Sequence, residues 1–226
     1  MKRITLTICS AAILLFSCND SDKTTTTDTT SDTTKMSEHS ASTDAATTPA
    51  NSPMPDSATM MKNWQAYMTP GDIHKMMASW NGNWEGESMM WDAPGAPPKT
   101  SKGSATNKMA MGGRYQVSNH KGDMMGMPFE GMSILAWDNF TKKFKNTWID
   151  NMGTGIIMME GPWDEANKSM TLKGKCVDVM RGNGAEMEMR QVFKVIDDKT
   201  HMMEMYCPGP DRKEYKMMEM KMTKKS

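Results

Sequence analysis

The side chains with the clearest capacity for chemistry are histidines that stand close to methionines. Two such clusters occur, His74-Lys75-Met76-Met77 and His201-Met202-Met203. Imidazole nitrogen and thioether sulfur together suit soft metal ions, Cu(I) above all. The two clusters are therefore candidate copper(I) sites.

Methionine is also abundant outside these clusters. The chain has 30 Met, and beyond the first 17 residues its only leucines are Leu135 and Leu172. Met is unbranched and adaptable, so the favoured interpretation is that it fills the core where Leu would normally stand. Because Met sulfoxide formation is reversible, an oxidant sink is a further interpretation.

No catalytic signature accompanies these residues. The sequence has no Gly-x-Ser-x-Gly elbow, phosphate loop, paired-Cys zinc spacing or His-Glu-x-x-His motif. The sequence therefore favours a non-enzymatic protein, and we expect no cofactor.

The amino terminus has the pattern of an export signal. Lys2 and Arg3 precede an apolar run from Ile4 to Phe16 that is too short to span a bilayer. The following Ser17 and Cys18 complete a segment that resembles a lipobox, in which the Cys is acylated after cleavage just before it. We interpret residues 1–17 as a lipoprotein signal peptide and Cys18 as the lipid attachment site. The alternative is an ordinary signal peptide that is cut elsewhere.

Residues 18–59 have the composition of a tether. Thr, Ser and Asp dominate residues 19–59, which contain no aromatic residue. Such a segment buries too little apolar surface to offset its ordering entropy, so we expect it to be disordered. Asp20 and Asp22 resemble surface-export signals of Bacteroidetes lipoproteins. The expected location is the cell envelope, anchored by lipid to the outer membrane on its periplasmic or its surface side.

Charge argues against nucleic acid as a partner. Without Lys2 and Arg3, the 27 basic residues fall to 25, against 27 acidic residues. A net charge near −2 gives no attractive field for phosphates, and no basic stripe is present. The predicted partner is the membrane, through the lipid anchor.

The remaining residues predict a helical lead-in over 60–80 and a β-barrel over 81–226. Thr69-Pro70-Gly71-Asp72 has the form of a helix start, with Thr as the N-cap. Ile73, Met76, Met77 and Trp80 then share one helical face. Ten period-two segments follow, near 83–92, 99–111, 113–120, 129–138, 143–150, 154–163, 168–179, 185–196, 200–207 and 213–223.

Tight turns join these segments, which predicts an all-β, roughly ten-stranded antiparallel barrel of lipocalin type, with a sandwich as the alternative. The alternation turns five methionines inward: Met187, Met189, Met218, Met220 and Met222. Cys176 and Cys207 fall on strands two apart, which is usually too far for a disulfide, so free thiols are favoured over a pair.

Residues 60–226 resemble the bacterial family known as domain of unknown function 1579. The resemblance is carried by Gly82-Asn83-Trp84-Glu85-Gly86, Pro94-Gly95-Ala96-Pro97, Met111-Gly112-Gly113-Arg114-Tyr115, Pro128-Phe129-Glu130-Gly131, Trp137-Asp138-Asn139, Thr147-Trp148-Ile149-Asp150-Asn151-Met152-Gly153-Thr154-Gly155, Glu204-Met205-Tyr206 and Lys213-Glu214-Tyr215-Lys216. The family has no established activity, so the resemblance implies a fold and no function.

A second resemblance is to the Gly-x-Trp opening of lipocalins and nitrobindins. There the Trp closes the barrel floor under a basic residue of the last strand, a position that falls here near Lys224. Nitrobindin-like barrels hold haem through a late His. The last His of this chain is His201, and we expect no haem.

Five polar or aromatic residues of the family strings form the candidate ligand site: Arg114, Glu130, Trp148, Asp150 and Thr154. At a barrel mouth they could fix the polar end of an apolar ligand. The alternative interpretation is that Gly113-Arg114 and Asp150-Asn151 set turns and that Arg114 pairs with an acid. The predicted function is a non-enzymatic envelope barrel that binds a small apolar or amphipathic ligand. The alternative is a Met-rich copper(I) or oxidant buffer.

Overall fold

The computed structural model describes residues 53–124 and 126–226. The predicted signal peptide, the lipid site at Cys18 and most of the predicted tether lie outside these residues. Within them, neither helix is long and apolar enough to cross a membrane.

Two short helices precede the sheet. Helix α1 spans Ser57–Met68 and begins inside the segment predicted as tether, because the carboxylate of Asp56 caps it by accepting from the amide of Thr59 at 2.8 Å. Helix α2 spans Asp72–Ser79 with Gly71 as its N-cap, so the prediction of Thr69 in that role is wrong. The Thr69 hydroxyl instead donates to the carbonyl of Gln65 at 2.6 Å and ends α1.

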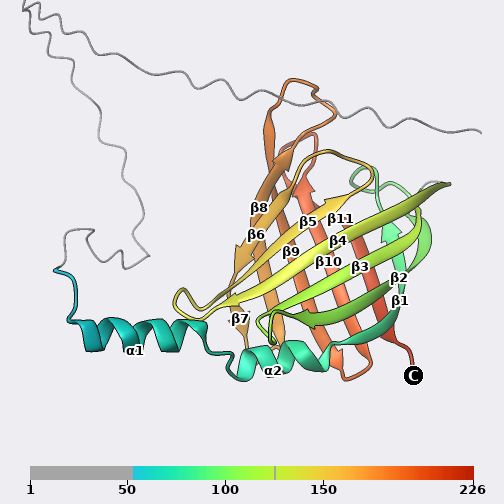
Figure 1. Ribbon diagram of the computed structural model, residues 1–226. Coiled ribbons are helices and arrows are strands. Elements are labelled where there is room, and N and C mark those ends of the chain that lie inside the picture. Colours follow the sequence, from blue (N-terminus) through green and yellow to red (C-terminus); the bar gives the residue numbers. More distant parts are fainter. Residues whose placement is uncertain (1–52, 125) are drawn as a thin grey trace, which may run out of the picture. The chain divides into compact units, whose positions relative to one another are not determined.

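The strands form one antiparallel sheet that closes into a barrel, as predicted (Figure 1). They are β1 (Gly82–Met90), β2 (Lys99–Ala110), β3 (Tyr115–Met124), β4 (Met127–Asp138), β5 (Lys143–Asp150), β6 (Ile157–Gly161), β7 (Trp163–Asp164), β8 (Ser169–Val177), β9 (Glu186–Asp197), β10 (Thr200–Pro208) and β11 (Glu214–Lys224). Apart from β6 and β7, neighbours in the chain pair with one another, β1 pairs with β11, and the pairing of β6 with β8 completes the closure.

The predicted strand boundaries agree with the structure to within a few residues, with one correction. The segment predicted as a strand over 154–163 starts only at Ile157 and breaks at Pro162, which leaves β7 as a two-residue continuation of β6. Proline has no amide hydrogen for the ladder, so it interrupts pairing there.

The two ends of the barrel differ. Helix α2 lies across the end at which β1 begins, and we call this the helix end (Figure 1). Met77 and Trp80 pack there against Phe144 and Leu172 in the main core, with Ile73 and Met76 beside them, as the predicted helical face requires. In the described residues, the opposite end includes the β1–β2, β5–β6, β8–β9 and β10–β11 connections, and we call it the loop end.

Most of the predicted inward methionines lie in the core. Met189 is buried in the main cluster and Met187 packs against it, while Met222 is buried beside Trp84 with Met220 against it. Met218 shares their face because it pairs with Met90 and Met205. These positions support the interpretation that Met replaces Leu as a core filler.

Candidate functional site

Two of the five candidate residues meet at the loop end. Trp148 and Asp150 stand two apart near the end of β5, so both point into the barrel. The indole Nε1 of Trp148 donates to Oδ2 of Asp150 at 2.7 Å, and Oδ1 of Asp150 accepts from the amide of Met152 at 2.9 Å. Asp150 therefore fixes the Trp148 ring and the start of the β5–β6 connection together.

Two residues outside the predicted ligand site complete this group. The His120 ring lies edge-on to the Trp148 ring with their centroids 5.1 Å apart, and the Phe129 ring stacks on it at 6.2 Å. Strand register explains the meeting, because His120 pairs with Gly131, which pairs with Asp150. We call His120, Phe129, Trp148 and Asp150 the Trp148 cluster.

Gly131 makes room for the cluster. A Cβ at this position would lie 2.5 Å from Cζ2 of Trp148, which no real side chain tolerates. The glycine of the family string Pro128-Phe129-Glu130-Gly131 therefore allows the indole to lie flat against β4. This close approach explains why the last position of the string is a glycine.

The His120 imidazole is neutral in the neutral pH range. Burial lowers its pKa to about 4, because the protein interior disfavours the charged form. The cluster thus combines three aromatic faces with a single carboxylate, and that carboxylate already accepts two hydrogen bonds. This arrangement suits binding of an apolar or amphipathic molecule better than proton transfer.

The other three candidates do not join the cluster. Glu130 points outward between Phe129 and Gly131 and pairs with Lys121 at 3.3 Å. Thr154 is exposed in the β5–β6 connection. Arg114 lies in the β2–β3 connection at the helix end, where its guanidinium donates to the carbonyl of Met111 at 3.1 Å. The prediction that all five share one mouth is wrong, because Arg114 stands at the opposite end of the barrel.

Small residues line one side of the loop half of the barrel. Gly86, Gly103 and Gly122 occupy paired positions on three successive strands, and the hydroxyls of Ser88 and Ser101 are hydrogen-bonded at 2.6 Å. Nearer the helix end, Ser118 is also buried. Strands β9 and β11 supply methionines to the same interior, and the sulfur of Met222 would lie 3.0 Å from a Cβ at Gly86.

A shallow groove of about 300 Å³ also lies at the loop end. Its lining comes from the β1–β2 connection and the start of β11: Trp91, Ala93, Pro94, Gly95, Tyr215 and Lys216. The loop end therefore presents aromatic surface on two sides, at this groove and at the Trp148 cluster.

The helix end is closed by Trp84, as the Gly-x-Trp pattern predicted. Trp84 is 1% exposed, and its Nε1 donates to the carbonyl of Trp80 at 2.9 Å. Nζ of Lys224 lies 5.7 Å from the centre of the Trp84 ring and donates to the carbonyl of Ser79 at 2.8 Å. The last strand thus supplies the basic residue expected over this Trp, with Lys in that position.

In neither predicted copper cluster do the His and Met side chains converge on one metal position. His74 accepts from the amide of Gly71 through Nδ1 at 3.1 Å, and Met77 is fully buried in the core. On β10, His201 and Met203 point inward, whereas Met202 pairs with the outward Lys194 and Lys221. Among residues 53–124 and 126–226, no group of three or more His, Cys, Asp or Glu side chains is placed to hold a metal.

His201 instead belongs to the aromatic core at the helix end. Its ring stacks on Trp84 at 4.2 Å and meets the edge of Phe193 at 5.0 Å. Burial, with a smaller contribution from the charge of Lys224, lowers its pKa to about 4. Its Nε2 is buried without a hydrogen-bond partner among the described residues.

Cys176 and Cys207 are free thiols, as favoured from the sequence. The thiol of Cys176 contacts the sulfur of Met189 at 3.0 Å. Burial raises the pKa of both thiols, so they stay protonated and behave as small core residues.

Comparisons with known proteins give a family match and a likeness in fold to solved structures. The family model described as protein of unknown function (DUF1579) matches residues 69–224. A search of curated proteins gives no significant sequence match. The crystal structure of Rv2717c from M. tuberculosis has a TM-score of 0.52 at 9% identity, over 70% of this chain and 100% of that one. A redesigned β-barrel has a TM-score of 0.35 at 9% identity, over 66% of this chain and 95% of that one.

Proposed function

The chain belongs to the DUF1579 family of proteins of unknown function, and from this premise we propose that it is a lipid-anchored, non-enzymatic barrel of the bacterial envelope. Its ligand is a small apolar or amphipathic molecule that enters at the loop end. The apolar part lies among the small residues and methionines of the loop half, and the polar part lies beside the Trp148 cluster.

The observation that carries this proposal is the difference between the two ends of the barrel. Trp84, Lys224 and α2 close the helix end with large side chains. The loop half has glycines and serines at the inward positions of β1, β2 and β3. A barrel that is filled at one end and lined by small residues toward the other has the architecture of a ligand-binding barrel.

N-phenyl-1-naphthylamine, an uncharged and mostly apolar fluorescent probe, tests the binding site. The full chain should bind it with saturable fluorescence enhancement. Replacing Trp148 with Leu should weaken binding about tenfold, which corresponds to about 1.4 kcal/mol, because the probe loses the aromatic face that Trp148 supplies.

The matched control is Ile149→Ala, the outward neighbour on the same strand, which should leave the affinity unchanged. Saturable binding that survives Trp148→Leu would place the ligand elsewhere in the barrel. Absence of saturable binding at micromolar concentrations, together with a protein that carries no co-purified lipid in native mass spectrometry, would sink the proposal.

The anchor is tested separately through Cys18. Cys18→Ser should release the protein from membranes and remove the acyl mass, because a lipoprotein cysteine carries several chains that hold it stably. Phase partition in a cloud-point detergent and intact-mass measurement check both points. A Cys18→Ser protein that stays in the detergent phase would contradict the lipoprotein assignment.

A further inference from the structure

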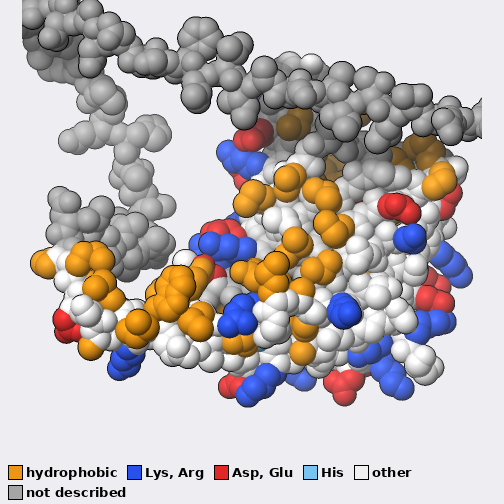
Figure 2. All heavy atoms as spheres, in the orientation of Figure 1, with side chains coloured by type: hydrophobic (Ala, Val, Ile, Leu, Met, Phe, Trp, Pro, Cys, Tyr) orange, Lys and Arg blue, Asp and Glu red, His pale blue; other side chains and the backbone are white. Residues whose placement is uncertain are grey.

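Helix α1 buries none of its own residues, although its sequence is rich in large apolar side chains. Met60, Trp64 and Tyr67 follow one helical face at spacings of four and three residues. With Met54, Pro55, Asn63 and Phe140 they line an open apolar groove of about 380 Å³. We call Met54, Met60, Trp64, Tyr67 and Phe140 the α1 patch, and Figure 2 shows hydrophobic side chains gathered over this helix.

The patch is held in place by the β4–β5 connection. The side-chain amide of Asn139 donates to the carbonyls of Ala66, Tyr67 and Thr69 at 3.2, 3.1 and 2.9 Å, which satisfies the end of α1. The rings of Tyr67 and Phe140 meet with their centroids 5.0 Å apart. Hydrogen bonds therefore hold the C-terminal end of α1, while its apolar face stays exposed.

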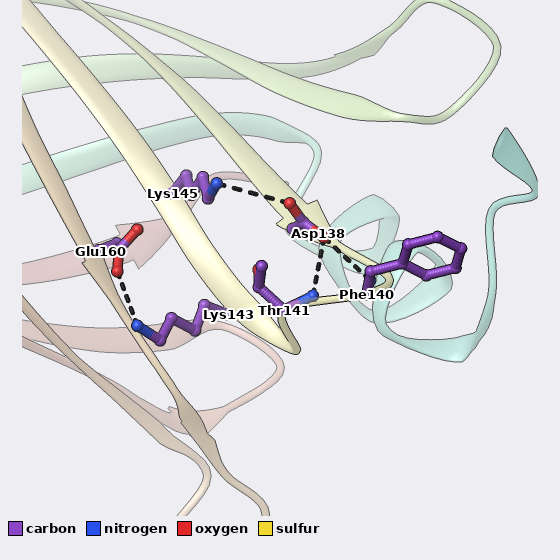
Figure 3. A network of polar contacts seen from close by, with 6 residues as sticks. All are labelled: Asp138, Phe140, Thr141, Lys143, Lys145 and Glu160. Atoms are coloured by element: carbon purple, nitrogen blue, oxygen red, sulfur yellow. Dashed lines mark hydrogen bonds and ion pairs between the residues drawn. The ribbon is translucent and has the colours of Figure 1, made fainter. Parts of the chain in front are cut away.

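The connection that presents Phe140 is itself braced (Figure 3). One oxygen of Asp138 accepts from the amides of Phe140 and Thr141 at 2.9 Å each, and its other oxygen pairs with Lys145 at 3.5 Å. Lys143 pairs with Glu160 on the neighbouring strand at 2.7 Å. In Figure 3 the Phe140 ring points away from this network toward α1. The exposed ring, 57% accessible, is thus a fixed feature of the turn.

The chemistry of the patch matches the interfacial layer of a bilayer. Trp64 and Tyr67 have large apolar bodies with a polar tip, the side chains that gather at membrane–water interfaces. Ser57–Met68 contains Lys62 and no acid, and Lys142 follows Phe140 closely. Cations beside an apolar face complement anionic lipid headgroups.

In the sequence, α1 lies closer to the proposed anchor at Cys18 than the barrel does. Pro53, shortly before α1, follows Cys18 by 35 residues. A lipid held at Cys18 would keep α1 near the bilayer and raise the local concentration of the patch at its surface. Among the described residues, α1 is the first element that follows that anchor in the sequence.

We propose that the α1 patch docks into the interfacial layer of an anionic bilayer and so orients the barrel relative to the membrane. This inference draws on the lipid anchor of the proposed function. Docking through α1 brings the helix end of the barrel toward the lipid and leaves the loop end facing away from it.

Vesicles of phosphatidylcholine and phosphatidylglycerol with brominated acyl chains test the docking. The acylated full chain is reconstituted, and the emission of Trp64 is taken as the difference between wild type and Trp64→Phe. We expect bromine to quench this difference signal. A patch variant, Trp64→Ser with Tyr67→Ser and Phe140→Ser, should keep its acyl anchor and its melting temperature.

The Cys18→Ser full chain tests the patch without the anchor. With vesicles in excess it should co-sediment with them weakly and reversibly, far less than the acylated chain does, and the patch variant in this background should lose about tenfold in affinity. The matched control is Val179→Ser with Met180→Ser, two exposed apolar residues of the β8–β9 connection at the loop end, 78% and 92% accessible. This control should bind vesicles as wild type does.

The outcomes separate the two proposals. An acylated protein whose Trp64 is not quenched keeps the anchor and overturns the docking. A chain that carries no acyl group but binds vesicles through the patch loses the anchor and keeps the docking. A dimer in sedimentation equilibrium that the patch variant dissociates, without vesicle binding, would show that a second copy covers the patch and would overturn the proposal.

Discussion

Trp84 is the residue whose side chain closes the helix end. It is almost fully buried, donates a hydrogen bond to Trp80 and stacks on His201. Trp84→Ala should lower the free energy of unfolding by about 3–5 kcal/mol, because the cavity cannot refill. Urea unfolding measures this change. Trp64→Ala, a change of the same size at a 63% exposed position, should cost less than about 0.5 kcal/mol, and equal losses in both variants would contradict the role of Trp84.

Two further single residues, His201 and His120, make the free energy of unfolding depend on pH. Each has a folded pKa of about 4, below the usual 6.5, so between these values the unfolded chain binds more protons. Their contribution to stability is complete above pH 6.5 and is lost as the pH falls toward 4. His201→Phe keeps an aromatic ring at the stack and should reduce the pH slope by about 1.4 kcal/mol per unit in this window. Urea midpoints at pH 7.5, 6 and 5 check it, and an unchanged slope would refute the assignment.

At the scale of elements, periodicity predicted the strands and local competition decided their ends. The alternation of Met187 and Met189 against Glu186 and Glu188 reports burial directly, so β9 was predictable. The start of α2 was not, because Thr69 can cap a following helix or end a preceding one, and Asn139, which satisfies the end of α1, lies 70 residues away. Long-range partners of this kind leave no local sequence signal.

In the candidate site too, the sequence predicts the positions of some residues and not of others. Trp148 and Asp150 stand two apart on one strand, so their shared face follows from the period of two. Only the family resemblance links Arg114 to these two residues. The order of the strands places it at the other end, because the β2–β3 and β5–β6 connections lie at opposite ends of an antiparallel barrel. The same alternation, taken from outward Glu130, would have turned Phe129 inward.

For the molecule as a whole, the question is why methionine stands where leucine is usual. Replacing Met187, Met189, Met218, Met220 and Met222 with Leu should preserve the fold, since each Leu–Met exchange usually costs less than about 1.5 kcal/mol. Circular dichroism and urea unfolding of the fivefold variant check this. Loss of cooperative unfolding would show that the barrel needs the flexibility of Met and not only its volume.

Copper separates this core role from a metal buffer. A Cu(I) buffer needs donors that converge, but Met202 faces outward while His201 is stacked between aromatic rings. We therefore expect no sub-micromolar binding when Cu(I) is titrated against a competing chelator. The fivefold Leu variant should behave like wild type in this titration, and cells that carry it should keep their copper tolerance. Tight binding that disappears when His201, Met202 and Met203 are changed together would overturn the core interpretation, because the strand would then have to rearrange to bring all three donors to one side.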